Sequence, residues 1–167
     1  MRIQAEQIAE LRADKEFWRA LAADVGPARY AEPGPMGEWS FGDIAGHLSG
    51  WRERTIRQVR GIARGGLEPP PPWPANLDAD DDVDEINDWI REQHAGRSPE
   101  ELVAEYAASY DRLIEALESV PADLRTTVVA WADEPLVEVD FTSHLHEEHV
   151  APVRAWLDGA GTARSGS

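Results

Sequence analysis

The sequence of 167 residues contains no cysteine. This absence excludes disulfide bonds, thiolate metal ligands and a nucleophilic thiol supplied by the protein. Long apolar runs are missing too, because no stretch approaches the roughly 20 residues needed to cross a bilayer. The N-terminal residues lack the apolar segment of a secretory signal. We therefore expect a cytoplasmic protein with no membrane partner.

Basic residues are scarce, and this limits the partners of the protein. Lys and Arg number 16 against 32 Asp and Glu, which gives a formal net charge of −16. Such a chain repels phosphate backbones, so nucleic acid is not an expected partner. The length and the seven Trp residues favour one domain with a single apolar core. We expect this domain to span residues 1–158, and residues 159–167 to form a disordered tail.

Apolar residues recur at helical spacing along five segments. The predicted helices cover approximately residues 8–25, 41–64, 83–94, 99–120 and 142–157. Ser40 and Ser98 stand at the N-cap positions of two of them. The apolar stripe of the second helix is predicted to hold Ile44, Leu48, Trp51, Thr55, Val59 and Ile62. This pattern predicts an all-α fold, an up-and-down four-helix bundle with a long crossover that carries the short helix 83–94.

We interpret two segments between the helices as non-helical chain that packs across the bundle. Residues 69–74 are rich in proline and predict a stiff strap, with Trp73 anchoring it on the core. Residues 122–139 include a short strand-like stretch, but no second strand is evident to pair with it. We therefore expect an extended loop there.

The histidines are the main candidates for functional residues. His47 lies on the inward stripe of the second helix, and His146 and His149 are neighbours on one turn of the last helix. Three neutral imidazoles in an apolar interior are suited to hold a divalent transition metal such as Zn, Ni, Fe or Mn, with a coordination position left open for a substrate. The alternative is that these rings are hydrogen-bonded core residues. Glu147 and Glu148 are either proton carriers beside the metal or surface residues.

Two segments of the sequence resemble the signatures of the DinB/YfiT-like superfamily of metalloenzymes. Residues 37–51 read GEWSFGDIAGHLSGW, and residues 146–157 read HEEHVAPVRAWL. The stretches at 84–90 and 109–113 resemble the branch that includes the colibactin self-resistance proteins. The resemblance implies that His47 and His149 are metal ligands. The superfamily places another histidine four residues before the last one, but position 145 here is Leu.

The identity of the third ligand therefore stays open between His144 and His146. We favour His146, because its neighbours on the helical wheel face the core. Pro152 removes one backbone hydrogen bond and is expected to bend this helix. Such a bend changes the direction in which the side chains before it point.

The resemblance implies an enzyme that transfers a low-molecular-weight thiol to a reactive small molecule, or hydrolyses that molecule, in a detoxification or stress role. The thiol would be exogenous, for example mycothiol, because the chain has no cysteine. Arg57 and Arg60 either hold an anionic cosubstrate or pair with acidic helices. A homodimer is expected from the family. The competing hypotheses are a non-catalytic bundle that sequesters a small metabolite, its metal site vestigial, and a structural module whose histidines are merely buried.

Overall fold

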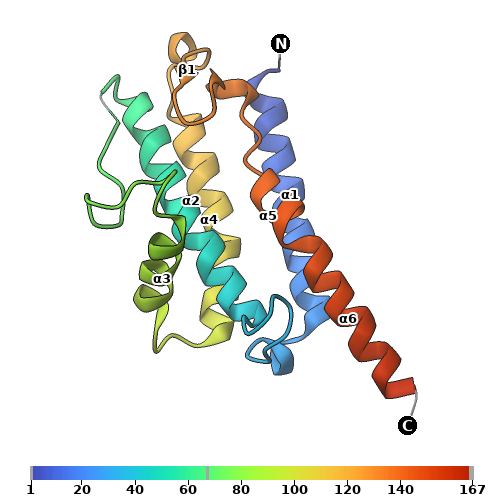
Figure 1. Cartoon of the computed structure of the whole chain (residues 1–167). Coiled ribbons are helices and arrows are strands. Elements are labelled where there is room, and N and C mark those ends of the chain that lie inside the picture. The colour runs from blue at the N-terminus through green and yellow to red at the C-terminus, as the bar shows by residue number, and fades with distance from the viewer. Residues whose placement is uncertain (1, 67, 166–167) are drawn as a thin grey trace.

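In the computed structural model, helices build nearly the whole fold, as the sequence predicts (Figure 1). The structure describes the backbone of residues 2–66 and 68–165 and the side chains within these ranges up to residue 159. The α-helices are α1 (Gln4–Val25), α2 (Phe41–Ala63), α3 (Val83–His94), α4 (Pro99–Glu118), α5 (Ser143–Glu148) and α6 (Val150–Ser165). Single 3-10 turns are formed by Pro27–Arg29, Ala122–Leu124 and Leu136–Glu138. No helix within the described residues is long and apolar enough to cross a membrane.

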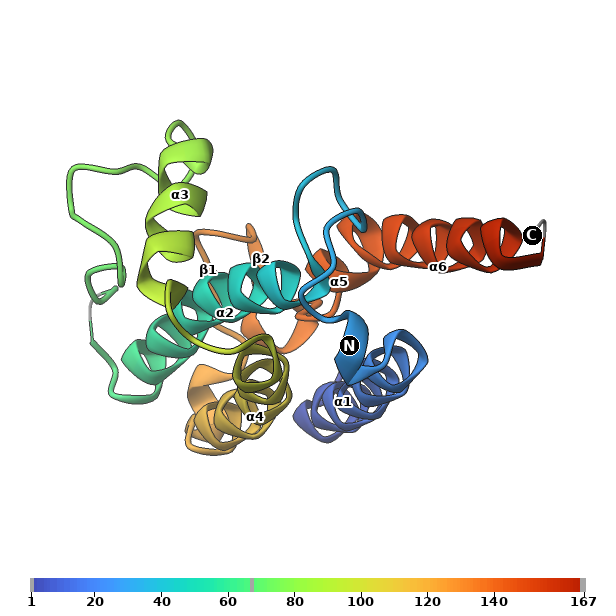
Figure 2. The same cartoon turned by 90° about the horizontal axis from the view of Figure 1, so that it is seen from below.

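The helices α1, α2 and α4 form the body of the bundle, and α3 covers the outer side of α2 (Figures 1 and 2). Trp18 lies at the centre of the core, stacked on Phe41 at 4.8 Å and in edge contact with Tyr106 at 4.7 Å between ring centroids. Apolar residues recur at helical spacing along both α1 and α4, and all of these are buried: Ile8, Leu11, Trp18, Leu21 and Val25 in α1, and Leu102, Tyr106, Tyr110, Leu113 and Leu117 in α4. Helical periodicity therefore located the core-facing sides of these two helices correctly.

The predicted stripe of α2 needs a correction. Arg52 and Ile56 are buried, whereas Trp51 and Thr55 are only half-buried. The physical reason is that α2 is contacted on two sides. Trp51 packs at 5.0 Å on Trp73 of the proline-rich strap, in a second cluster with residues of α3 rather than in the main core.

The two N-caps agree with the sequence. The Ser40 hydroxyl accepts a hydrogen bond from the backbone N–H of Asp43, and the Asp43 carboxylate accepts one from the N–H of Ser40. Ser98 and Glu101 make the same reciprocal pair at the start of α4. These capping boxes satisfy backbone donors that the first turn leaves unpaired. They fix where α2 and α4 begin.

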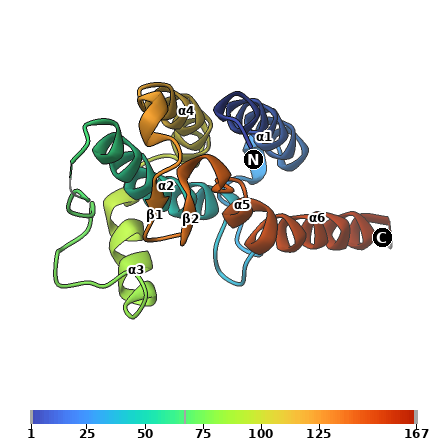
Figure 3. The ribbon, with the colours of Figure 1, turned by 90° about the horizontal axis from the view of Figure 1, so that it is seen from above.

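The last predicted helix is divided in two. The α5 helix ends at Glu148, and α6 begins at Val150. Pro152 explains the break, because it has no N–H to donate to the carbonyl of residue 148 and its ring crowds that carbonyl. The α6 helix then continues to Ser165, past the end expected near Gly159, and projects from the bundle (Figures 1 and 3). Glycine weakens a helix by about 1 kcal/mol without ending it. Residues 166–167 of the predicted tail lie outside the described residues.

The segment 122–139 also differs from its prediction. It forms a small antiparallel hairpin, in which β1 (Val128–Val129) pairs with β2 (Glu134–Pro135). The partner of the strand-like stretch is thus β2, which begins five residues after β1 ends. Two side chains that follow the hairpin, Leu136 and Val137, are buried. The segment therefore closes one end of the bundle before the chain enters α5 (Figure 1).

The close approach of α3 to α2 gives a test of the fold. A methyl group added at Gly50 would lie 2.5 Å from Ile90 Cγ2. We predict that Gly50→Ala lowers the free energy of unfolding, because overpacking costs about 1–3 kcal/mol and the gain in helix propensity is at most about 1 kcal/mol. Gly159→Ala is the matched control in open space and is expected to leave stability unchanged or raised. Chemical denaturation of the three proteins measures this, and a Gly50→Ala protein as stable as the wild type would contradict the packing.

Candidate metal centre

Three histidines from separate parts of the chain meet between α2 and α5. His47 stands on α2, His144 in α5, and His149 at the break before α6. Their ring centroids are 5.0 Å apart for His47 and His144, 5.2 Å for His47 and His149, and 5.1 Å for His144 and His149. One ring nitrogen from each residue can be chosen so that all three lie within 4.8 Å of one another. These three rings could hold a metal ion.

The helix break brings His144 and His149 together. In an unbroken helix, five residues correspond to about 500°, so these two side chains would point about 140° apart. The backbone of His149 has φ −120° and ψ −28°, away from ideal helical values. This distortion turns the ring of His149 toward that of His144. The sequence alone favours His146 because a helical wheel assumes a regular helix, and the distortion at His149 departs from that assumption.

The hydrogen bonds of the three rings are incomplete. His149 Nδ1 lies 2.8 Å from the Met36 sulfur, a contact that places the proton on Nδ1 and leaves the lone pair on Nε2. That Nε2 is buried without a partner among the described residues, as is Nδ1 of His47. The Nε2 atoms of His47 and His144 lie 3.1 Å apart. Two nitrogens bound to one tetrahedral zinc ion are separated by about 3.3 Å, given Zn–N bonds of about 2.0–2.1 Å.

The electrostatic environment keeps the three rings neutral. The pKa of His47 is lowered to about 3, first by burial and then by the neighbouring rings. Burial also lowers the pKa of His144 to about 4, with the positive charge of Arg52 acting in the same direction. The pKa of His149 is lowered to about 4, again chiefly by burial. Neutral imidazole is the form that binds metals.

The structure places His146 elsewhere, which corrects the preference drawn from the sequence. Its Nε2 makes a very short contact with the carboxylate of Asp14 on α1, and its ring packs on Phe17 at 4.6 Å. Asp14 is buried and also accepts a hydrogen bond of 2.6 Å from the Tyr110 hydroxyl. His146 therefore joins α5 to α1 instead of facing His47.

The other predicted site residues lie at differing distances from the cluster. The Glu148 carboxylate is 3.5 Å from Nε2 of His144, with its side chain largely exposed. Glu147 is exposed and makes no hydrogen bond or ion pair with any described residue. Arg57 pairs with Glu53 of α2 itself, on the surface of that helix, rather than with a neighbouring acidic helix. Arg60 is half-buried and, like Arg57, does not line either of the two cavities that border the histidines.

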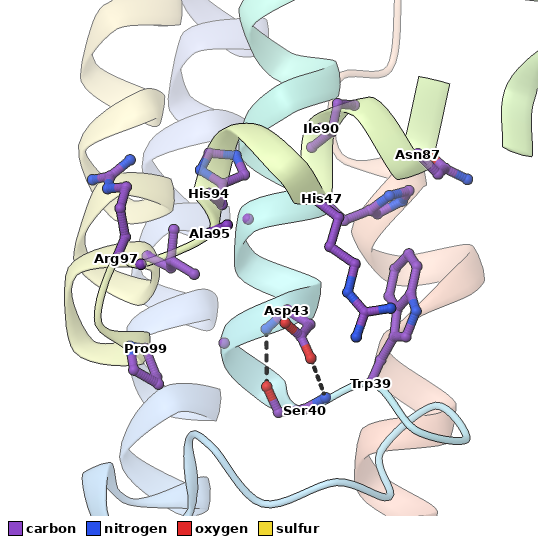
Figure 4. Close-up of a pocket in the computed structure, with 15 residues that line it drawn as sticks. Trp39, Ser40, Asp43, His47, Asn87, Ile90, His94, Ala95, Arg97 and Pro99 are labelled. Atoms are coloured by element: carbon purple, nitrogen blue, oxygen red, sulfur yellow. Dashed lines mark hydrogen bonds between the residues drawn. The ribbon is translucent and has the colours of Figure 1, made fainter. Parts of the chain in front are cut away.

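One of these cavities, of about 260 Å³, is lined by His47 and by residues of α3 and the α3–α4 turn (Figure 4). His47 and Trp39 lie at one side of it and His94 and Arg97 at another. His94 is half-buried and packs against Gly46, where an added methyl would lie 3.1 Å from the ring.

The second cavity, of about 440 Å³, is lined by His144 and Arg52. Sequence reasoning missed Arg52, although helical spacing could have found it. It stands four residues after Leu48 and four before Ile56, so it belongs to the buried stripe of α2. A guanidinium at such a position is unusual, because arginine is rarely fully buried without a partner.

The lowered pKa values of the histidines predict how the metal-free protein responds to acid. Between pH 6.5 and about 4, the unfolded chain binds protons that the folded rings do not, so the free energy of unfolding falls as the pH falls. Each histidine contributes a slope of up to about 1.4 kcal/mol per pH unit in this window. We predict that the free energy of unfolding of His149→Gln varies less steeply with pH than that of the wild type. Denaturant titrations with a chelator present measure both proteins. Carboxylates titrate equally in the wild type and in the variant, so their contribution cancels when the two slopes are compared. Equal slopes would therefore contradict the neutral, buried state of His149.

Comparison with protein families identifies the family of this chain. The family model for the mycothiol maleylpyruvate isomerase N-terminal domain matches residues 11–151. The match begins within α1 and ends just after His149, so it includes all three histidines of the cluster. Searches among curated proteins and among solved structures found no match. The chain therefore belongs to the mycothiol maleylpyruvate isomerase N-terminal domain family, within the DinB/YfiT-like superfamily.

Proposed function

We propose that the protein is a metal-dependent enzyme that transfers a low-molecular-weight thiol to a reactive small molecule, or hydrolyses that molecule, in a detoxification role. The observation that carries the proposal is the convergence of three neutral histidines at one point. It is supported by membership of a family described by a mycothiol-dependent isomerase. The metal, the thiol and the substrate are all part of the proposal.

The proposed ligands are His47, His144 and His149. Considered as a hydrogen-bonded core cluster, these residues leave buried nitrogens of His47 and His149 unpaired. An unpaired buried polar group costs about 1–3 kcal/mol. Considered as a ligand set, each residue offers one ring nitrogen to a shared cation, which would give the unpaired Nε2 of His149 a partner and accounts for the close pair of Nε2 atoms of His47 and His144. Nδ1 of His47 has no partner in either case. The donor set therefore fits a divalent transition metal.

The chain itself supplies no thiol, so a transferred thiol comes from outside. A metal bound here would act as a Lewis acid, favouring the thiolate form of a thiol or polarising a substrate oxygen. In this proposal Glu148 exchanges the proton of the thiol with solvent, because its carboxylate lies beside His144 and its side chain is exposed. Glu147, which has no contact with the cluster, is assigned no step.

The metal ligands can be tested by two matched substitutions in α5. We predict that protein purified without an affinity tag binds one zinc ion per chain. His144→Gln is expected to weaken zinc affinity by at least about a hundredfold, because a ligand is lost and second-shell changes alone cost 10–100-fold. His146→Gln is the control, two residues away, and is expected to retain zinc affinity within a few-fold. Competitive titration with a chromophoric chelator measures both. Loss of zinc in His146→Gln with retention in His144→Gln would contradict the assignment.

The same proteins test the activity. With mycothiol and the electrophile monochlorobimane, the zinc-loaded wild type is expected to form the fluorescent conjugate faster than the uncatalysed reaction. His144→Gln should lose this rate, and His146→Gln should keep most of it. Zinc binding without any acceleration, across a panel of thiols and electrophiles, would favour the non-catalytic, metabolite-binding alternative. Absence of zinc binding would contradict the metal centre itself.

A further inference from the structure

The cavity beside His144 is lined by both aromatic and polar side chains. It has a volume of about 440 Å³ and lies between α2, α4 and the segment that leads into α5. Trp51, Trp131 and Phe141 contribute to its walls. His144 is part of its lining, so a molecule held here lies next to the proposed metal ligands. Arg52 also lines the cavity.

Arg52 is held rigidly at this position. Only 7% of its surface is exposed, and its guanidinium lies over the rings of Tyr106 and Tyr110, at 4.5 and 4.0 Å from their centroids. It donates hydrogen bonds of 3.3 Å to the Ser109 hydroxyl and to the Phe141 carbonyl. Counting a polar contact with the Tyr106 hydroxyl, at least two of its five N–H donors are left for another acceptor.

No carboxylate of the described residues forms an ion pair with Arg52, although the chain has twice as many acidic as basic residues. The buried carboxylate of Asp14 is engaged by Tyr110 and His146 instead. Buried charges in proteins are normally paired, because removing an ion from water is costly. Contact with two tyrosine faces offsets part of this cost without supplying a counter-charge. Arg52 is therefore a buried cation without an ion-pair partner among the described residues.

We propose, building on the proposed function, that this cavity binds a substrate carboxylate on the guanidinium of Arg52, with the rest of the substrate directed toward His144. The guanidinium lies against two rings, so its edge is available to a planar carboxylate. A singly charged group suits the site better than a phosphate dianion, because Glu134 and Asp140 line the cavity together with Arg52 and Arg54, so that its acidic and basic side chains are equal in number. Arg52 thus determines which class of electrophile enters: organic acids in preference to their neutral analogues.

A matched pair of ligands tests this inference by calorimetry. Phenylacetate and its neutral amide, phenylacetamide, have nearly the same shape and differ in charge. We predict that metal-free wild type binds phenylacetate about 10–100-fold more tightly than phenylacetamide, the range of charge-assisted hydrogen bonds. Arg52→Gln should abolish this preference, and Arg52→Lys should retain part of it. Arg12→Gln is the control, since it removes an equal charge from an exposed pair with Glu118 on the bundle surface.

The outcomes separate this inference from the proposed function. Equal binding of acid and amide by the metal-free wild type would overturn the role of Arg52, and this result does not depend on whether Arg52→Gln folds. A preference that appears only with zinc and survives Arg52→Gln would also overturn it, because the carboxylate would then bind the metal. A preference that depends on Arg52 in a protein without zinc binding or thiol transfer would support the inference and reject the proposed function.

Discussion

The structure depends on three imidazoles being removed from water and directed at one another. Burial lowers the pKa of each ring to about 3 or 4, which keeps the cluster neutral at physiological pH. Neutral rings avoid mutual repulsion, yet they leave buried nitrogens without hydrogen-bond partners. Such an arrangement is costly as a core and favourable as a ligand set. The fold supports it with the capping box that fixes the start of α2 and with Pro152, which breaks the last helix.

Much of the fold could be predicted from local patterns. Helical periodicity and capping residues located the helices, since each depends on neighbours within a few positions in sequence. His47 and His149 were predicted from the same patterns and the family signatures, and both lie in the cluster. The structure places His144 rather than His146 in the cluster, because the sequence argument for His146 assumed a regular helix through His149. Pro152 indicated a bend, but its position does not specify which ring the bend turns inward.

The remaining differences come from long-range contacts, which a single sequence does not reveal. Whether a charge is buried with or without a partner depends on which segments pack over it, so the lack of an ion pair at Arg52 and the contact of the buried Asp14 with His146 could be read only from the structure. The hairpin β1–β2 pairs stretches too short to carry an alternation of apolar residues. The homodimer, the small-molecule substrate and the absence of a nucleic-acid partner stay predictions. Two cavities border the cluster, one lined by His47 and the other by His144.

The central claim is that one metal ion is shared by His47, His144 and His149. X-ray absorption spectroscopy at the zinc edge of the zinc-loaded protein tests it most directly. The account predicts nitrogen or oxygen ligands at about 2.0–2.1 Å with the multiple scattering of several imidazole rings. It also predicts no sulfur ligand near 2.3 Å, because the chain has no cysteine and the Met36 thioether contacts Nδ1 of His149. A spectrum without imidazole scattering, or a protein that retains no zinc, would contradict it.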